Sequence, residues 1–372
     1  SLSPYQEVSI FKGLIYYFIA FLSSFYKTSR SLSIKSMNVS DKAMIKCDKI
    51  VSVMKSEHLS PFKYSNTNKR YHTLTYYYEH TYGGKVAKLA LDAGFSCPHI
   101  FNHHQGGCTF CSVRGSGDFT FSMIDLHTQM KAQKAIMQNK WPKAKTIAYF
   151  QAYTNTYAPL NILKEIYDPF FDDTYDHVEV AIGTRSDCLD DDIIAYFIEK
   201  SKLKPITIEL GVQSIHPSTS RLINRQHSLE SVEEVLQKLK DTNIKVVLHM
   251  INGLPKETPE MMVESFKWVA KQPIHGVKIH MLHILEGTVM GIAYKHNPWP
   301  MLTMDEYVSI IVDQLEVLPP TMIIHRLTGD ALPSDLIEPK WTIKKVNVLN
   351  HIDVEFVRRN SMQGSKYETQ EY

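Results

Sequence analysis

Short apolar runs and helical patterns alternate along this chain from residue 85 onward, and this alternation narrows the fold to one class. The runs are rich in Val, Ile and Leu and indicate six buried strands, at residues 86–91, 146–151, 177–182, 205–210, 244–250 and 277–282. The segments between them carry helix start signals, such as Ser228 and the pair Thr258 and Pro259. We therefore predict an α/β fold with a parallel sheet, helices outside it and a site at the carboxyl ends of the strands.

Three of the five cysteines, Cys97, Cys108 and Cys111, lie within fifteen residues directly after the first predicted strand. Five cysteines in 372 residues do not make a disulfide scaffold, and such a group in a reducing compartment indicates a metal site. Two cysteines separated by two residues can bind one metal centre from a single turn, and the third returns from across the loop. The pattern predicts a cytoplasmic metalloprotein.

The number of ligands distinguishes two kinds of metal site. Thiolates suit zinc and iron–sulfur clusters alike. A structural zinc ion takes four ligands, and the loop offers three histidines as the fourth: His99, His103 and His104. Three thiolates on a [4Fe–4S] cluster would instead leave one iron open for a substrate or cofactor. Both alternatives stay open at this point.

The cysteine loop and seven other segments, in this order, resemble the radical S-adenosylmethionine (SAM) superfamily. The spacing C-x10-C-x2-C is longer than the usual C-x3-C-x2-C of that class. It is similar to the subgroup related to the Elongator catalytic subunit, and most closely to a bacterial family of short, stand-alone proteins. The matching segments are residues 69–74, 94–111, 149–157, 183–188, 209–214, 224–227, 253–255 and 325–330.

The resemblance implies a fold, two cofactors and a partner. The fold is a partial (β/α)6 TIM-like barrel over residues 54–298, with an extension at 1–53 before it and a segment at 299–372 that closes the barrel. The cofactors are a [4Fe–4S] cluster on the three cysteines and SAM, which the family cleaves reductively in order to abstract hydrogen from a substrate. The implied partner is a low-potential electron donor of the flavodoxin or ferredoxin type.

Three SAM contacts are implied by matching motif to motif. Phe110, the aromatic residue before the last cysteine, corresponds to a position that packs near the adenine. Gln213 corresponds to a residue that binds SAM through its ribose. Arg225 corresponds to an arginine that pairs with the SAM carboxylate, a contact that suits the bidentate guanidinium fork. Without this motif context, Gln213 would more simply be interpreted as a turn-forming amide and Arg225 as a surface arginine.

The resemblance leaves other positions with two interpretations each. His249 stands where a relative carries an acidic ribose ligand, and a core histidine is the alternative. Gln151 and Asn155 replace the usual Gly-Gly-Glu that receives the SAM amino group. Gly253 matches a turn that lets the backbone approach the adenine, although an ordinary strand-to-helix turn would need it as well. Cys188 is the one catalytic candidate, as a thiol that quenches a radical, and a buried structural cysteine is the simpler alternative.

The substrate is less constrained than the chemistry. Elongator-type relatives modify the wobble uridine of tRNA, so tRNA wobble-uridine modification is the leading hypothesis, with tRNA as a partner. The tyrosines at 76, 77, 78 and 82 are available to stack bases or to fill the core. The alternatives are a radical SAM enzyme acting on a small molecule or a protein, and a non-catalytic iron–sulfur or zinc module. The net charge of +2 does not by itself indicate nucleic acid.

The amino-terminal part has a different character. Residues 1–85 hold 12 Lys and Arg against 5 Asp and Glu. Residues 14–25 are apolar but too short for a membrane span, which needs about 20 apolar residues, so we do not expect a membrane partner. A helix lying on a membrane surface is the alternative. Because Met37, Met44 and Met54 are alternative starts, we expect the first residues to be an appendage to the fold.

Overall fold

The computed structural model describes residues 60–101, 107–112, 115, 125–172 and 174–368. The chain divides into two compact units, Ser1–His58 and Leu59–Tyr372, and every described residue belongs to the second. The predicted extension at 1–53 lies outside the described residues, as do His103 and His104. No helix in the described part of the chain is long and apolar enough to cross a membrane.

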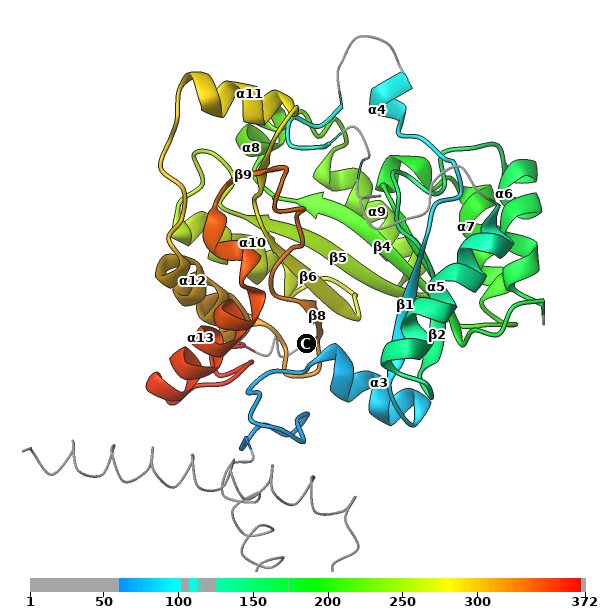
Figure 1. Cartoon of the computed structure of the whole chain (residues 1–372), viewed down its shortest axis with the longest axis horizontal. Helices are drawn as coiled ribbons and strands as arrows, with labels where there is room; N and C mark the ends of the chain where they lie inside the picture. Colours follow the sequence, from blue (N-terminus) through cyan, green and yellow to red (C-terminus); the bar gives the residue numbers. More distant parts are fainter. Residues whose placement is uncertain (1–59, 102–106, 113–114, 116–124, 173, 369–372) are drawn as a thin grey trace, which may run out of the picture. The chain divides into compact units, whose positions relative to one another are not determined.

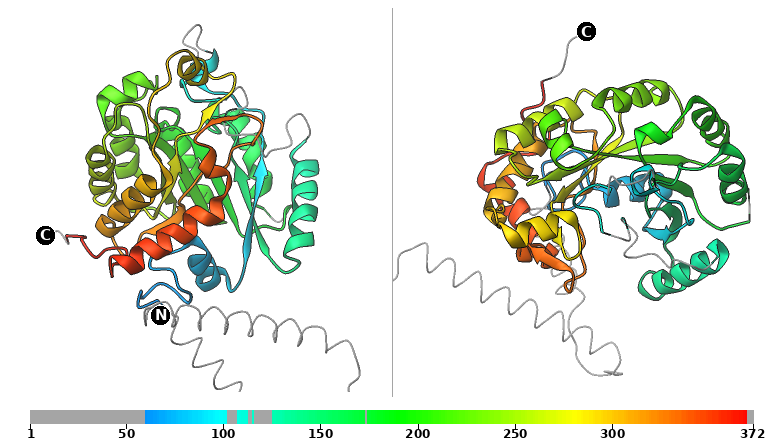
Figure 2. Two further views of the ribbon diagram at one scale, coloured as in Figure 1. Left: turned by 60° about the vertical axis from the view of Figure 1, so that its left-hand side comes forward. Right: turned by 90° about the horizontal axis from the view of Figure 1, so that it is seen from above.

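Seven parallel strands form one sheet in the order β1-β2-β3-β4-β5-β6-β8. They are β1 (Val86–Leu91), β2 (Lys145–Phe150), β3 (Glu179–Thr184), β4 (Ile206–Gln213), β5 (Lys245–Asn252), β6 (Gly276–Met281) and β8 (Ile323–Arg326). The sheet curls into a half-barrel with helices on its outside (Figure 1, Figure 2). Spatial order follows chain order because each crossover carries the chain to the next parallel strand. The predicted α/β partial barrel is confirmed, with one strand more than the six expected.

Amphipathic helices cover the outer face of the sheet. They include α5 (Leu126–Lys140), α6 (Leu160–Tyr167), α7 (Asp191–Lys200), α9 (Leu229–Leu239), α10 (Pro259–Val269) and α12 (Met304–Val317). The main core lies between these helices and the alternate strand residues that face them, such as Ile182, Leu210 and Leu248. Ser228 and Thr258 cap α9 and α10 as predicted, since each hydroxyl accepts a bond from the backbone N–H three residues on.

The remaining elements are short, except for α13, which has 14 residues. They are α4 (Pro98–Phe101), η1 (Asp168–Phe170), η2 (Ser186–Cys188), α8 (Pro217–Leu222), β7 (Ile284–Leu285), α11 (Val289–His296), β9 (Leu336–Glu338), η3 (Lys340–Ile343) and α13 (Lys345–Arg358). β7 and β9 pair antiparallel as a separate two-stranded sheet. The segment from residue 299 thus supplies the edge strand β8 of the main sheet as well as α12 and α13.

Helix α3 (Leu74–Tyr82) packs against both edge strands, β1 and β8. It immediately precedes β1, so it lies at the end of the strands opposite to the cysteine loop (Figure 1). Tyr78 is buried, and Tyr77 and Tyr82 pack around it against Tyr149 on the inner face of the sheet. Tyr78 fills the core, as one of the two interpretations predicts, and Tyr77 and Tyr82 are partly buried around it beside Lys245.

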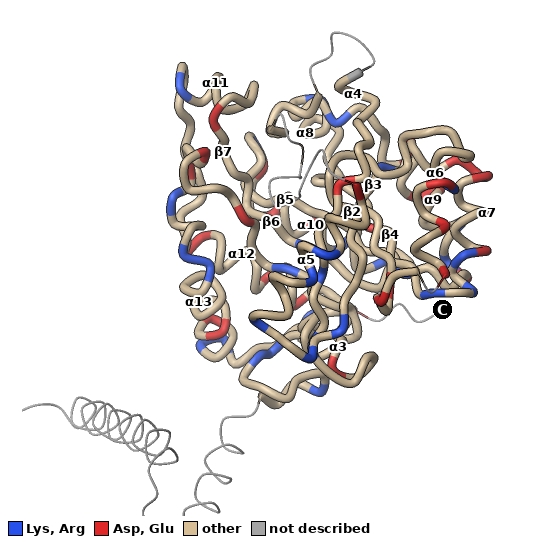
Figure 3. The backbone as a smooth tube through the Cα atoms, turned by 45° about the vertical axis from the view of Figure 1, so that its right-hand side comes forward, with Lys and Arg blue, Asp and Glu red and all other residues tan. Residues whose placement is uncertain are grey.

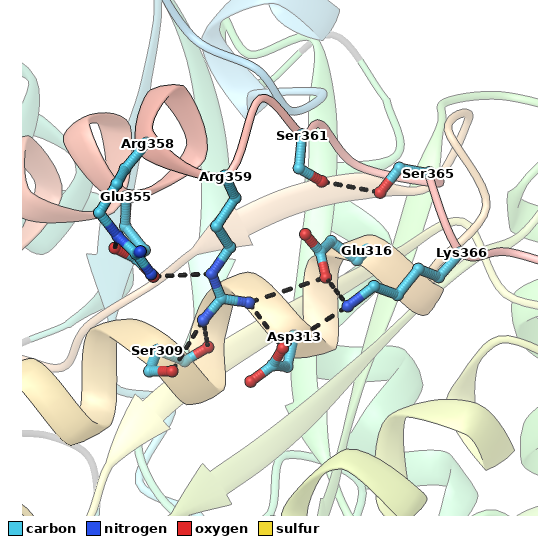
Figure 4. Close-up of polar contacts among 9 residues, drawn as sticks. All are labelled: Ser309, Asp313, Glu316, Glu355, Arg358, Arg359, Ser361, Ser365 and Lys366. Carbon is cyan, nitrogen blue, oxygen red and sulfur yellow. Dashed lines mark hydrogen bonds and ion pairs between the residues drawn. The ribbon is translucent and has the colours of Figure 1, made fainter.

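Arg359 directly follows α13 and bonds both to α12 and to α13 itself (Figure 4). Its Nη1 donates to Asp313 (2.6 Å), its Nε to Glu355 (2.7 Å) and its Nη2 to Ser309 Oγ (2.7 Å). Its side chain is only 18% exposed, whereas that of Arg358, which binds Glu355 alone, is 69% exposed. Of these two arginines, it is therefore Arg359 that connects α13 to α12.

We expect Arg359→Ala to destabilise the fold by about 1–2 kcal/mol, an amount that already allows for solvent screening of the partly exposed guanidinium. Urea unfolding of the purified chain measures this change. The matched control is Arg358→Ala, which is expected to leave the unfolding midpoint unchanged because that side chain contacts only one carboxylate and is mostly in solvent. Equal effects of the two substitutions would contradict the role assigned to Arg359.

Candidate cofactor and active site

The cysteine loop begins where β1 ends and is held in place by backbone hydrogen bonds. Cys97 directly precedes α4. The amide of Cys111 donates to the carbonyl of Cys108 (3.0 Å), so these two residues share one turn. The amide of Thr109 donates to the carbonyl of Ile223 (3.0 Å), which ties the loop to the segment after α8. Because the strands are parallel, the segments that follow them lie at the same end of the sheet. The three cysteines therefore lie at the carboxyl ends of the strands.

The thiols of Cys108 and Cys111 interact with each other and with a positive charge. Their mutual hydrogen bond lowers the pKa of Cys108 to about 5 and holds the pKa of Cys111 well above its ordinary value. The imidazole of His99 and the guanidinium of Arg185 further lower the pKa of Cys108, against the opposing effect of burial. A cationic surrounding of this kind favours the thiolate, which is the form that binds metals.

The donors on this loop fit an iron–sulfur cluster. Three thiol side chains on one loop, beside a buried guanidinium, match the ligand type and the negative charge of such a cluster. Within the described ranges, no group of three or more His, Cys, Asp or Glu side chains is placed to hold a single metal ion. A cluster does not require such a group, because its cysteines bind different iron atoms rather than one point.

Arg185 is a site residue that the sequence interpretation missed. It directly follows β3 and is 8% exposed. Its Nε and Nη2 donate to the two carboxylate oxygens of Asp187 (2.9 and 2.7 Å). Its Nη1 lies 3.3 Å from Nδ1 of His99 and donates to the main-chain carbonyl of Arg225 (3.2 Å). Its position at the carboxyl end of a strand was the available signal, because that end of a barrel strand carries functional side chains.

Arg225 is 2% exposed, and its guanidinium is bonded to the main chain. Its Nε donates to the carbonyl of His227 (3.1 Å), and its Nη1 donates to the carbonyls of Val212 and Ser214 (2.6 Å each). These bonds hold the segment after β4 against the end of that strand. A bidentate contact with a SAM carboxylate would use Nη2 together with a nitrogen that these carbonyls already engage. The SAM contact of Arg225 therefore stays a prediction, alongside a structural role that the bonds define.

Two amide side chains keep a buried oxygen without a partner in the part of the chain that the structure describes. Gln213 ends β4 with a φ of +61°, where the register with β5 shifts, and its Oε1 is unpaired. Asn155 donates from Nδ2 to the carbonyls of Gly183 (2.9 Å) and Phe150 (3.2 Å), and its Oδ1 is unpaired. Such oxygens can accept a bond from a ligand. The SAM contacts of Gln213 and Asn155 remain predictions, as does that of Gln151, which directly follows β2.

His249 belongs to a group of charged and polar side chains inside the curl of the sheet. Its Nε2 lies 2.9 Å from a carboxylate oxygen of Glu209. The same carboxylate contacts Lys278, Lys88 (2.8 Å) and the hydroxyl of Tyr149 (2.8 Å). Burial, and then Lys278, lower the pKa of His249 to about 4, so the ring is neutral at pH 7. This geometry favours the core-histidine alternative, and the ribose contact stays a prediction.

Gly253 and Phe110 are held by apolar neighbours. Gly253 has a φ of +80°, and a Cβ placed there would lie 2.7 Å from Cε of Met281. The turn itself therefore requires glycine for its backbone conformation, whereas the flexible end of Met281 could move away from a side chain. Phe110 packs on a small apolar cluster that includes Leu254 and Ile223. The adenine contacts of these two residues remain predictions.

Cys188 ends η2 and is half-buried beside Asp187, whose Oδ1 lies 3.9 Å from its Sγ. Burial, and then the charge of Asp187, raise the pKa of Cys188 to about 12. The side chain therefore stays a protonated thiol at neutral pH, and a thiol is the form that can donate a hydrogen atom. The catalytic role of Cys188 stays a prediction.

Comparisons with known proteins agree with this geometry. A family model for the radical SAM superfamily matches residues 103–269, and one for the Radical_SAM C-terminal domain matches residues 274–358. YtqA of Bacillus subtilis is 45% identical over 313 residues, which are 83% of this chain and 96% of YtqA. A tRNA uridine(34) acetyltransferase of Methanocaldococcus infernus is 29% identical over 163 residues, which are 43% of this chain and 30% of that protein.

A solved structure shares the fold. The archaeal Elp3 of Methanocaldococcus infernus with an N-terminal deletion superposes with a TM-score of 0.58 at 20% identity, over 75% of this chain and 64% of that one. Members of the matched superfamily are enzymes that normally bind a [4Fe–4S] cluster and SAM. With two family models in succession and near-complete coverage of YtqA, this chain belongs to the radical SAM superfamily, in a group of short members that includes YtqA.

Proposed function

We propose that this enzyme holds a [4Fe–4S] cluster on Cys97, Cys108 and Cys111, binds SAM beside it, and modifies the side chain of a tRNA wobble uridine. The observation that carries the proposal is the cysteine loop at the carboxyl end of β1, in a chain of this superfamily. The tRNA part is supported by the partial similarity to a tRNA uridine(34) acetyltransferase. When bound, the two cofactors would supply reductive cleavage of SAM and abstraction of hydrogen from the substrate.

The protein's own contribution would be to position these groups. The three thiolates would hold the cluster, and the charge of Arg185 would offset part of its negative charge. Gln213 and Asn155 would use their unpaired oxygens to orient SAM. The tyrosines of α3 seal the opposite end of the curl, so the substrate would enter at the carboxyl ends of the strands.

Contact with tRNA would also occur at that end. On the outside of the half-barrel, α12 carries Asp and Glu without Lys or Arg, and α13 carries charges of both signs (Figure 3), so these helices attract phosphates weakly. Arg326, which ends β8, and Lys345, which begins α13, both pair with Asp330 near the carboxyl end of β8. A protein that binds in this way would show affinity for tRNA that falls as salt rises.

The test is anaerobic turnover of the full chain. The protein is reconstituted with iron and sulfide, reduced with dithionite and given SAM, with and without bulk tRNA, and 5′-deoxyadenosine is quantified. Nucleosides from the digested tRNA are then compared by mass spectrometry. We expect tRNA to increase 5′-deoxyadenosine formation and to change the mass of a wobble-uridine nucleoside.

The two parts of the proposal fail separately. Cleavage of SAM without any change in wobble nucleosides would contradict the tRNA part and point to a small-molecule or protein substrate. Absence of SAM cleavage from a chain with a fully loaded cluster would contradict the cofactor chemistry as well.

A further inference from the structure

A cavity of about 360 Å³ lies beside α8 in the described part of the chain. Its volume falls at the lower end of the range of about 300–1,000 Å³ that small-ligand sites occupy. None of the residues predicted to contact SAM is among those that line it. We call it the α8 pocket, and its lining residues are Ser218, Thr219, Arg221 and Leu222 from α8, and Pro255 and Lys256 from the turn after β5.

The α8 pocket lies next to the cysteine loop. Helix α8 follows β4 and the turn follows β5, so both belong to the carboxyl ends of the strands, and α8 lies at the same end of the half-barrel as α4 (Figure 1). The residues directly after α8 bond to the loop. The carbonyl of Ile223 accepts from the amide of Thr109 (3.0 Å), and Nδ2 of Asn224 donates to the carbonyl of Gly107 (2.7 Å). A ligand in the pocket would therefore be held at a fixed position relative to the cysteine loop.

Two cations of the α8 pocket have no counterion within the described part of the chain. Arg221 and Lys256 are exposed, and neither side chain forms a hydrogen bond or an ion pair with another described residue. By contrast, Arg185, Arg326 and Lys345, at the same end of the sheet, each pair with an aspartate. The charges of Arg221 and Lys256 are therefore available to an anion from outside the chain.

The carboxylate of Glu257, which follows Lys256, is engaged elsewhere. It accepts hydrogen bonds from the hydroxyls of Ser214 and Thr219, and burial raises its pKa. Thr219 is only 3% exposed, so this contact fixes one wall of the pocket. Glu257 forms no ion pair with either pocket cation, and the pocket keeps its positive charge.

Lys256 adopts a backbone conformation that favours glycine. Its φ is +71°, and the amide of Glu257 donates to the carbonyl of Leu254 (3.1 Å), which makes Lys256 the third residue of a four-residue turn. A third position with positive φ is normally occupied by glycine or asparagine. Residues strained in this way concentrate at ligand clamps and active sites. The conformation therefore indicates a role for the lysine side chain beyond the turn itself.

The lining of the α8 pocket favours a phosphate that carries a sugar. Two cations repel a metal ion and attract an anion, and a guanidinium matches the geometry of a phosphate. Beside them lie Pro255 and Leu222, which is 40% exposed, so one side of the pocket is apolar. A free inorganic ion has no use for apolar surface, whereas a phosphodiester and its sugar fit both kinds. Because four of the lining residues are exposed, a large molecule can reach the pocket.

We propose that the α8 pocket binds a backbone phosphate of the substrate tRNA through Arg221 and Lys256, with the attached sugar against Leu222. This inference rests on the proposed function, because it takes tRNA as the substrate. The contact would position the RNA beside the cysteine loop without reading its sequence, as phosphate contacts generally do.

The first test measures binding rather than turnover. Labelled bulk tRNA is titrated with the reconstituted full chain at several salt concentrations, for wild type, Arg221→Gln and Lys256→Gly. We expect each substitution to raise Kd about 10-fold at low salt and to reduce the slope of log Kd against log salt by up to about one. The control is Lys240→Gln, an exposed lysine that ends α9 and precedes β5, at the opposite end of the strands. Wild-type affinity in both pocket variants would overturn the proposal, as would absence of tRNA binding by wild type.

Lys256→Gly also separates binding from folding. Glycine adopts a positive φ without strain, so the melting temperature of this variant is expected to stay unchanged or to rise. Weaker tRNA binding by a variant of undiminished stability supports the phosphate contact. Weaker binding found only together with a lower melting temperature would attribute the loss to folding and contradict the assignment.

The second test identifies the source of the phosphate. The reconstituted full chain is acetylated with an N-hydroxysuccinimide ester at equal ionic strength, alone, with bulk tRNA or with uridine 5′-monophosphate. Peptide mass spectrometry compares the modification of Lys256 with that of Lys240. Protection of Lys256 by tRNA supports the proposal. Protection by the mononucleotide alone would assign the pocket to a free nucleotide and overturn the tRNA contact, and equal rates in all three samples would overturn the site.

The proposed function is judged separately, by the nucleosides of the digested tRNA. If tRNA protects Lys256 and wobble nucleosides do not change, the pocket stands and the modification fails. If wobble nucleosides change equally with wild type and Arg221→Gln at limiting tRNA, the modification stands and the pocket fails.

Discussion

Replacing Cys108 by alanine is expected to abolish 5′-deoxyadenosine formation. Cys108 shares a turn with Cys111, and its low pKa makes it the most readily ionised thiol of that pair. Without it the loop retains two of the three proposed cluster ligands, which cannot retain a four-iron cluster in one orientation. The reconstituted wild-type chain should contain about four iron atoms per molecule. The variant should contain far less iron and should form no more 5′-deoxyadenosine than protein without iron.

Cys188→Ala is the matched control for this experiment. Its thiol lies near the same loop, since the charge of Cys97 contributes to its raised pKa, but we do not assign it to the cluster. The variant should load the same amount of iron as wild type. If Cys188 donates a hydrogen atom to a substrate radical, SAM cleavage persists and product yield falls. Loss of iron from Cys188→Ala and not from Cys108→Ala would contradict the assignment of ligands.

Glu209→Gln is expected to destabilise the fold by about 3–5 kcal/mol, because it leaves buried cations without their carboxylate. The side chain of Glu209 is 0% exposed and contacts Lys88, Lys278 and His249. Burial opposes ionisation of Glu209, but Lys278 and then Lys88 outweigh it and hold its pKa well below the ordinary value. Urea unfolding at neutral pH measures the loss. Adding Lys278→Met to Glu209→Gln should recover part of it, because one uncompensated charge is removed.

The same carboxylate predicts a dependence of stability on pH. Because the pKa of Glu209 is lower in the folded chain than in the unfolded chain, its contribution is fully present above the unfolded value and is lost as pH falls towards the folded value. Below about pH 5, wild-type stability should therefore fall more steeply than that of Glu209→Gln. Parallel pH profiles of the two proteins would show that folding does not lower the pKa of Glu209.

The sequence by itself determined the features that depend on neighbouring residues. Apolar runs alternating with helical patterns predicted the parallel sheet and the helices outside it, because strand and helix periodicity are properties of short segments. Ser228 and Thr258 cap the helices that they precede for the same reason. The cysteine spacing, placed directly after the first strand, was sufficient to predict the loop that the structure places at the end of β1.

The tertiary structure decided what each polar side chain contacts. Arg225 bonds to three main-chain carbonyls, and Arg185, from a different strand, lies near the same cysteines. His280 and His283 come together with Gly329 only because β8 pairs with β6. Such contacts join residues that are far apart in the chain. They depend on the register and curvature of the whole sheet, and no local pattern of residues specifies these.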